Sequence, residues 1–183
     1  MLLDAARSQL LIVDMQERLM PAMHQAETVI DRCALLLQTA AELKVPALVS
    51  EQYRKGLGAT VPRLGNALGD VPVMEKMHFS CAADPAMAAH IKGLAAQGRN
   101  QLVVAGVEAH VCVLQSVLGF KDMGLDVYLV ADAVTSRQPQ SVALAESRVR
   151  HAGGSVVNTE MVSFEWLHIA GTPEFKVVSK LMK

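Results

Sequence analysis

The chain has 183 residues, of which 51% are hydrophobic and 4% are aromatic, and its formal net charge is −1. This length fits one domain with a full core, and the balanced charge gives no electrostatic reason to expect nucleic acid or an anionic membrane as a partner. No apolar run approaches the roughly 20 residues of a membrane-spanning helix, and residues 1–7 resemble neither a secretory signal nor a transit peptide. We therefore expect a single domain over residues 1–183.

The chain contains three cysteines, Cys33, Cys81 and Cys112, which are widely spaced and form no C-x-x-C pair. This pattern indicates neither a disulfide framework nor a zinc site. It favours a reducing compartment, so we expect a cytoplasmic protein. Cys33 falls on the apolar stripe of a helical pattern, which predicts that it packs in the core. Cys81 is expected to be buried rather than catalytic.

Short apolar runs alternate with helical patterns along the whole chain. The expected strands span residues 8–14, 46–50, 71–76, 102–105, 125–130 and 155–158. The expected helices span residues 25–43, 84–98, 111–123 and 139–152, and they are followed by a C-terminal helical segment at 159–183. Asp84 and Pro85 provide the N-cap and the first residue of the second helix. Polar loops are expected at 51–58, as a pocket wall or lid, and at 131–137.

Strands that alternate with helices specify an α/β fold, with a parallel sheet covered on both faces. Right-handed crossovers favour a Rossmann-like three-layer α/β/α arrangement with six parallel strands in the order 3-2-1-4-5-6. In that order the first and fourth strands are neighbours, and the ligand crevice lies at their carboxyl ends. The loop at 51–58 is not a G-x-G-x-x-G fingerprint and no P-loop lysine follows it, so a phosphate cradle is not expected.

Three side chains of catalytic type are expected to meet at this crevice. Asp14 closes the first strand, Lys76 closes the third, and Cys112 follows the turn that Gly106 makes after the fourth. Each residue alone also has a structural explanation: Asp14 as a turn cap, Lys76 as a solvated lysine, and Cys112 as a buried, inert thiol. Their convergence on one edge of the sheet favours a functional role for all three.

A thiol, a carboxylate and an ammonium group can act together as a nucleophile, a base and a charge that adjusts pKa. Asp14 can take the proton of Cys112, and Lys76 favours the ionised forms of both. The start of a helix also lowers the pKa of a thiol, so we expect this effect at Cys112. Backbone N–H groups around Glu108 and Cys112 could stabilise an oxyanion. The chemistry indicated is attack by sulfur on an electrophilic carbon, followed by hydrolysis of the covalent intermediate.

The chain resembles the isochorismatase-like cysteine hydrolases, a family that includes nicotinamidases and related amidohydrolases. The resemblance extends over about residues 8–160, and its motifs are LLIVDMQ at 10–16, EK at 75–76 and AGVEAHVCV at 105–113. It places Asp14, Lys76 and Cys112 on the family's Asp-Lys-Cys triad. A finer resemblance, to the isochorismatase domain-containing proteins, is carried by residues 50–58, 108–110 and 132–137.

The resemblance implies two features that spacing could not reveal. One is a cis peptide between Val107 and Glu108, a costly bond outside proline, which would turn the Glu108 amide to join the Cys112 amide in an oxyanion hole. The other is a homo-oligomer, a dimer or larger, with contacts from the C-terminal segment.

The substrate crevice is expected to be lined by side chains from several loops, namely Gln16, Leu19, Tyr53, His78, Phe79 and His110. We expect His110 to be a structural histidine beside the nucleophile rather than a second base. His78 and Phe79 are either pocket walls or core residues.

The chain departs from its metal-binding relatives. Those nicotinamidases carry an Asp-x-His ligand set after the second strand, where this chain has Ser50, Glu51 and Gln52. We therefore expect no bound zinc or iron and no other cofactor, and nicotinamide is disfavoured as a substrate. Ala109 also stands where the family often has Thr, and no acid suited to a vinyl ether is recognisable.

These observations predict a cysteine-dependent hydrolase that acts on a small amide or related carbonyl compound through a thioester-type intermediate. The alternative is a catalytically inactive homologue that serves as a binding or assembly module with an oxidation-sensitive thiol. A dinucleotide-dependent oxidoreductase is a third possibility, which the missing glycine fingerprint disfavours.

Overall fold

The computed structural model describes residues 1–182 and contains one six-stranded sheet. The strand order is β3-β2-β1-β4-β5-β6 and every pairing is parallel, which confirms the predicted topology. β1 and β4 lie at the centre of the sheet and every one of their residues is buried, as expected when helices cover both faces. The strands are β1 (Ser8–Val13), β2 (Ala47–Gln52), β3 (Val73–Lys76), β4 (Gln101–Val107), β5 (Asp126–Thr135) and β6 (Ser155–Val157).

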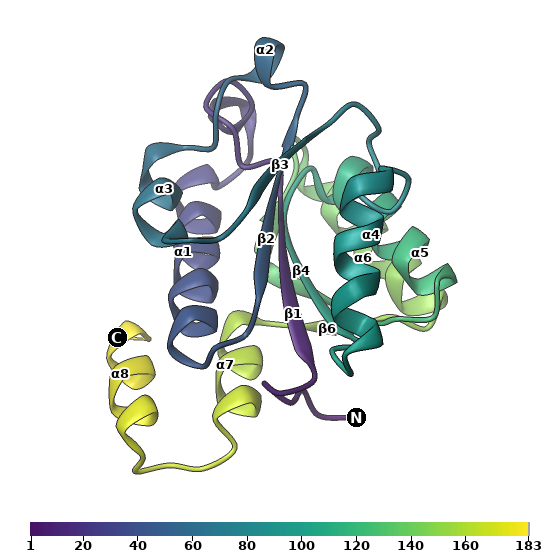
Figure 1. Cartoon of the computed structure of the whole chain (residues 1–183). Coiled ribbons are helices and arrows are strands. Elements are labelled where there is room, and N and C mark those ends of the chain that lie inside the picture. Colours follow the sequence, from purple (N-terminus) through teal and green to yellow (C-terminus); the bar gives the residue numbers. More distant parts are fainter. Residues whose placement is uncertain (183) are drawn as a thin grey trace.

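Helices form a layer on each face of the sheet, so the three-layer α/β/α architecture is confirmed (Figure 1). One layer contains α1 (Ala26–Glu42), α3 (Pro62–Leu68), α7 (Thr159–Leu167) and α8 (Pro173–Leu181). The other layer contains α4 (Pro85–Ala96), α5 (Leu114–Asp122) and α6 (Pro139–His151). The one-turn helix α2 (Arg54–Leu57) projects beyond the carboxyl edge of the sheet, at the top of Figure 1.

The largest difference from the expected elements concerns residues 131–137, for which the sequence predicts a polar loop. β5 instead continues to Thr135. After an irregularity between Val104 and Gly106 it pairs again with β4, so that Thr135 lies opposite Val107. Helices α2 and α3 also form where no helix is predicted, and α3 begins with Pro62 in its first turn, a position that proline favours.

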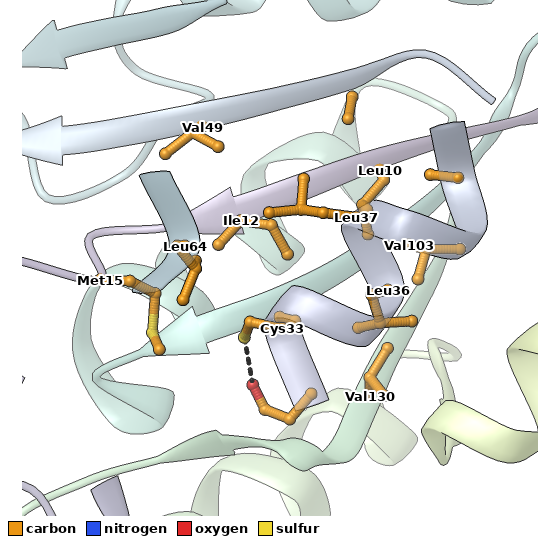
Figure 2. Packing of buried hydrophobic residues seen from close by; sticks show 14 of the residues in the cluster. Leu10, Ile12, Met15, Cys33, Leu36, Leu37, Val49, Leu64, Val103 and Val130 are labelled. Atoms are coloured by element: carbon orange, nitrogen blue, oxygen red, sulfur yellow. Dashed lines mark hydrogen bonds between the residues drawn. The ribbon is translucent and has the colours of Figure 1, made fainter. Parts of the chain in front are cut away.

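α1 packs its apolar face on the centre of the sheet (Figure 2). The buried residues follow the predicted helical spacing and include Val29, Ile30, Cys33, Leu36, Leu37 and Ala40. The thiol of Cys33 donates a hydrogen bond to the carbonyl oxygen of Ala133 over 3.5 Å (Figure 2). Burial raises the pKa of the Cys33 thiol well above its usual range. The core-packing role predicted for Cys33 is therefore confirmed.

α4 begins as predicted, with Asp84 as its N-cap. The Asp84 carboxylate accepts hydrogen bonds from the backbone N–H groups of Ala86 and Met87, each over 3.1 Å. Pro85 occupies the first helical position, where its missing N–H group costs nothing. The segment between β3 and α4 therefore ends at Asp84.

The C-terminal segment is helical, as predicted, and α7 returns to the amino end of the sheet (Figure 1). The indole N–H group of Trp166 donates to the Ser8 hydroxyl over 2.9 Å, and Glu165 accepts from the backbone N–H group of Leu3 over 2.7 Å. These contacts attach α7 to the start of β1. Over residues 1–182, no helix combines the length and the apolar character needed to cross a lipid bilayer.

Gly106 allows β1 and β4 to approach each other closely at the carboxyl edge. The sequence predicts a turn there, but β4 continues to Val107, and Gly106 pairs with Val13 at a φ of 111°. A Cβ atom on Gly106 would lie 2.6 Å from the backbone nitrogen of Val13 and would also collide with its carbonyl oxygen. Only glycine tolerates this backbone angle and this contact at no cost.

We expect Gly106→Ala to lower the free energy of unfolding by at least about 3 kcal/mol, because it combines an unfavourable φ with a backbone collision. Denaturant-induced unfolding measures the change. The control is Gly93→Ala in α4, where a Cβ atom meets open space and should stabilise the helix by about 0.5–1 kcal/mol. Equal stability of the two variants would contradict the role given to Gly106.

Candidate active site

Asp14 follows β1 directly and is completely buried, with a positive φ of 52°. Its backbone N–H group donates to the carbonyl oxygen of Ser50 over 3.0 Å. The carboxylate accepts two short hydrogen bonds, one from the Ser50 hydroxyl and one from the Lys76 ammonium group, each over 2.7 Å. The structure therefore gives Asp14 far more than a turn-capping role.

Lys76 ends β3, and its side chain is 0% exposed. Its ammonium group donates to Asp14 Oδ2 and to Gln52 Oε1, each over 2.7 Å. A buried lysine is costly unless it is paired and hydrogen-bonded. The explanation of Lys76 as a solvated lysine is therefore wrong, and the predicted meeting of Lys76 with Asp14 is observed.

Ser50 and Gln52 are the partners that the sequence analysis missed. Both lie at the end of β2, which the strand order places between β1 and β3. Because side chains alternate along a strand, Ser50 and Gln52 point to the same face of the sheet. The predicted strand order together with this alternation could have identified them as the link between Asp14 and Lys76.

Cys112 lies in the segment that connects β4 to α5. The peptide bond between Val107 and Glu108 is cis, as the family resemblance implies. Residues Ala109–Val113 then form a short π-helical turn before α5 begins. Cys112 is 7% exposed and belongs to the same apolar cluster as Cys81, which is completely buried.

Ser116 links the two cysteine-bearing segments. Its hydroxyl donates to the carbonyl oxygen of Cys112 over 2.6 Å and accepts from the backbone N–H group of Cys81 over 2.8 Å. Ser116 is completely buried in α5. The thiol-bearing turn and the segment that follows β3 are thus joined through one side chain.

The pKa of the Cys112 thiol lies well above its usual range. Burial is the largest cause, and the negative charge of Asp14 raises the pKa further, whereas the positive charge of Lys76 lowers it. The expectation that the start of a helix makes this thiol acidic is therefore wrong. Cys112 sits in a buried turn, where loss of hydration outweighs the helix dipole. The raised pKa favours the neutral thiol at Cys112.

Glu108 is held at the edge of the site by the segment that follows β5. One of its carboxylate oxygens accepts hydrogen bonds from the backbone N–H group and the side-chain Nε of Arg137, each over 3.1 Å. Next to this pair, His110 Nδ1 lies 2.9 Å from the Ser136 hydroxyl. The contact places His110 between the thiol-bearing turn and the loop after β5, which agrees with a structural role for this histidine.

A model of the isochorismatase domain matches residues 8–161 of the chain. The chain belongs to the isochorismatase family. Over 180 residues it is 36% identical to "Isochorismatase domain-containing protein 2" of Danio rerio, a match that covers 98% of the chain and 89% of the relative. It is also 37% identical over 179 residues to "Secreted isochorismatase effector Isc1" of Phytophthora sojae, which covers 96% of the chain and 84% of that relative.

A solved structure supports the same assignment across the whole chain. "MAR1 Ribonuclease from Caenorhabditis elegans" matches with a TM-score of 0.92 and 31% identity, covering 100% of this chain and 92% of the other. Membership of the isochorismatase family makes this protein an isochorismatase-like hydrolase in the broad sense.

The residues predicted to line the crevice differ widely in their surroundings. In this isochorismatase-like chain, Gln16 is completely buried and its amide binds the backbone of Gln52 and Gly58. Leu19 packs on the core cluster on the α1 side of the sheet, whereas Cys112 packs on the other side. Tyr53, His78 and Phe79 are all exposed.

A cavity of about 500 Å³ opens at the end of β3. It is lined by Glu75, Lys76, Met77, His78 and Asp84. Its position beside Lys76 agrees with His78 as a pocket-wall residue, the role predicted from the sequence.

The stretch where metal-binding nicotinamidases carry ligands has a different function in this isochorismatase-like chain. Ser50 and Gln52 bind the Asp14–Lys76 pair, while Glu51 accepts from the backbone N–H group and hydroxyl of Thr60. Over the described residues 1–182, no group of three His, Cys, Asp or Glu side chains is arranged to hold a metal ion.

Asp14 and Lys76 should be coupled in stability. We expect Asp14→Asn and Lys76→Met each to lower the free energy of unfolding by about 3–5 kcal/mol, because each leaves a buried charge without its partner. The double variant should lose clearly less than the sum of the two. Urea unfolding of the four proteins measures the coupling, and strictly additive losses would show that the pair is not coupled.

Proposed function

We propose that the protein is a cysteine-dependent hydrolase that acts on a small amide or related carbonyl compound. Cys112 is the nucleophile, Asp14 is the general base, and Lys76 holds and orients Asp14. The observation that carries the proposal is the buried Asp14–Lys76 ion pair, with 2.7 Å between its atoms, whose charges act on the pKa of the neighbouring Cys112. A fold does not need two buried charges beside a cysteine, since buried ion pairs are weak contributors to stability.

In the first step Asp14 accepts the thiol proton while the Cys112 sulfur attacks the carbonyl carbon of the substrate. The negative charge that develops on the carbonyl oxygen is stabilised by the backbone N–H groups of Glu108 and Cys112. Collapse of this intermediate breaks the carbon–nitrogen bond, and Asp14 returns its proton to the leaving amine. The product of this step is a thioester on Cys112.

In the second step a water molecule hydrolyses the thioester. Asp14 is again a carboxylate and accepts a proton from the water, while the water oxygen attacks the carbonyl carbon of the thioester. The carbon–sulfur bond then breaks, the proton passes to Cys112, and a carboxylic acid leaves. The raised pKa of Cys112 supports this cycle, because it makes the neutral thiol the state to which the enzyme returns.

Cleavage of RNA is a second candidate, because the relative from Caenorhabditis elegans is named a ribonuclease. The chain's formal net charge of −1 does not favour a polyanionic substrate. A thiol nucleophile is also better suited to a carbonyl carbon than to a phosphodiester.

A hydrolysis screen of small amides and imides tests the proposal. We expect wild-type protein to release ammonia or an amine from an amide, or to convert an imide to a carboxylic acid and an amide, and Cys112→Ala to reduce this activity to the background of buffer alone. The same two proteins are incubated with single-stranded RNA. Amide hydrolysis that survives in Cys112→Ala, or RNA cleavage that does not depend on Cys112, would contradict the assignment of the nucleophile.

The reactivity of Cys112 distinguishes an enzyme from an inactive homologue used for binding or assembly. For an enzyme, iodoacetamide should modify Cys112 near neutral pH, and Asp14→Asn should slow this reaction by about a hundredfold because the base is lost. Mass spectrometry of the Cys112 peptide gives the rate. An inactive homologue would react at the rate of a simple buried thiol in both proteins.

We also propose that the protein self-associates through its C-terminal segment. Met161, Phe164, Ile169 and Val177 are large apolar side chains that remain exposed on or beside α7 and α8. Analytical ultracentrifugation should give a mass of at least two chains, and Phe164→Glu with Val177→Glu should shift the distribution towards monomer. A monomeric wild-type protein at micromolar concentration would exclude this assembly.

A cytoplasmic location accords with the cysteine content, because Cys33, Cys81 and Cys112 are all free thiols. The relative from Phytophthora sojae is named a secreted effector. Cell fractionation with a tagged full-length chain decides between the two locations.

A further inference from the structure

We propose that Gln52 is a positioning residue of the Cys112 site: its neutral amide fixes the Lys76 ammonium group without adding a negative charge to the Asp14–Lys76 pair. The inference rests on the proposed cysteine hydrolase function. It concerns a residue at the very position where metal-binding relatives would place a ligand.

Lys76 depends on Gln52 for one of its two side-chain acceptors. An ammonium group carries three N–H donors and no acceptor, so each donor that is removed from water needs a partner. Lys76 Nζ donates to Asp14 Oδ2 and to Gln52 Oε1 over the same distance of 2.7 Å. Without Gln52, a lysine that is 0% exposed would have Asp14 as its only side-chain acceptor among residues 1–182.

The Gln52 amide has its orientation fixed by its neighbours. Its Nε2 donates to the carbonyl oxygen of Met77 over 2.9 Å, so Oε1 must face Lys76. The backbone of Gln52 is held on both sides by the Gln16 amide, which accepts from its N–H group over 2.7 Å and donates to its carbonyl oxygen over 3.0 Å. Gln52 also pairs directly with Lys76 in the β2–β3 register. It is therefore a rigid support.

Charge explains why an amide suits this position. The Asp14 charge raises the pKa of Cys112, and the Lys76 charge opposes it. A glutamate at position 52 could accept the same hydrogen bond, but its charge would disfavour the thiolate that must form during attack. Gln52 binds Lys76 without this penalty, so the positive charge remains available to the sulfur.

Glu51, the residue before Gln52 in β2, keeps its negative charge away from the Asp14–Lys76 pair. Glu51 is a buried carboxylate, but it binds Thr60 and lies 3.4 Å from Arg54. Because side chains alternate along β2, Glu51 points to the opposite face of the sheet from Gln52. At the end of β2, the Gln52 amide therefore faces the Asp14–Lys76 pair, whereas the Glu51 carboxylate faces away from it.

The test compares Gln52→Glu, Gln52→Met and the matched control Gln9→Met. Gln9 is a second buried glutamine, and its amide donates to the backbone carbonyl oxygens of Ile91 and Arg99 near the amino end of β1. For each folded protein, the rate of Cys112 alkylation by iodoacetamide is followed by mass spectrometry from about pH 6 to pH 10. Circular dichroism confirms folding at each pH.

We expect Gln52→Glu to lower the rate of Cys112 alkylation about tenfold or more across this pH range, because the added negative charge disfavours the thiolate that forms during attack. Gln52→Met keeps the shape of the side chain but removes the acceptor. It should also lower the alkylation rate about tenfold at every pH, because Lys76 is no longer held in place. Gln9→Met should match the wild type.

Each other outcome overturns the proposal. A wild-type alkylation rate in both Gln52 variants, with slow alkylation in Asp14→Asn, would remove the role of Gln52 and leave the proposed function intact. An equal loss of Cys112 alkylation rate in Gln52→Met and Gln9→Met would show that Gln52 acts only through packing. Unchanged alkylation in Asp14→Asn would end the proposed function, and this inference with it. If Gln52→Glu does not fold, the comparison of Gln52→Met with Gln9→Met decides.

Discussion

The site depends on one buried ion pair, between the Lys76 ammonium group and the Asp14 carboxylate. Two charges removed from water cost several kcal/mol each unless partners compensate them. The fold supplies these partners from the carboxyl ends of three adjacent strands, with Ser50 and Gln52 of β2 lying between Asp14 after β1 and Lys76 of β3. The strand order is therefore a condition for this arrangement, because it places β2 between β1 and β3.

Under the proposed function, the ion pair also explains how a buried cysteine can act as a nucleophile. Burial and the Asp14 charge hold the Cys112 thiol neutral, and Lys76 offsets part of this effect. Reactivity then comes from proton transfer to Asp14 at the moment of attack rather than from a stable thiolate. The helix-terminus argument fails here because a dipole contributes only about 1 kcal/mol, which is less than the cost of burying a charged sulfur.

Much of the fold could be predicted from the sequence because its signals are local. Apolar runs and helical spacing located the six strands and α1, and the handedness of crossovers gave their order. The same order brought Asp14 and Lys76 together. The extension of β5 to Thr135 and the contact between Glu108 and Arg137 could not be predicted, since they depend on residues far apart in the chain. Ser50 and Gln52 were overlooked because they carry no charge and match no catalytic motif.

The hydroxyl of Ser116 has a mechanical consequence for the two sides of the crevice. It joins the backbone of Cys81 to that of Cys112 over 2.8 Å and 2.6 Å. The wall formed after β3 and the turn that carries the sulfur therefore cannot drift apart independently. Under the proposed function, a ligand that displaces the segment after β3 would therefore also displace the backbone of Cys112.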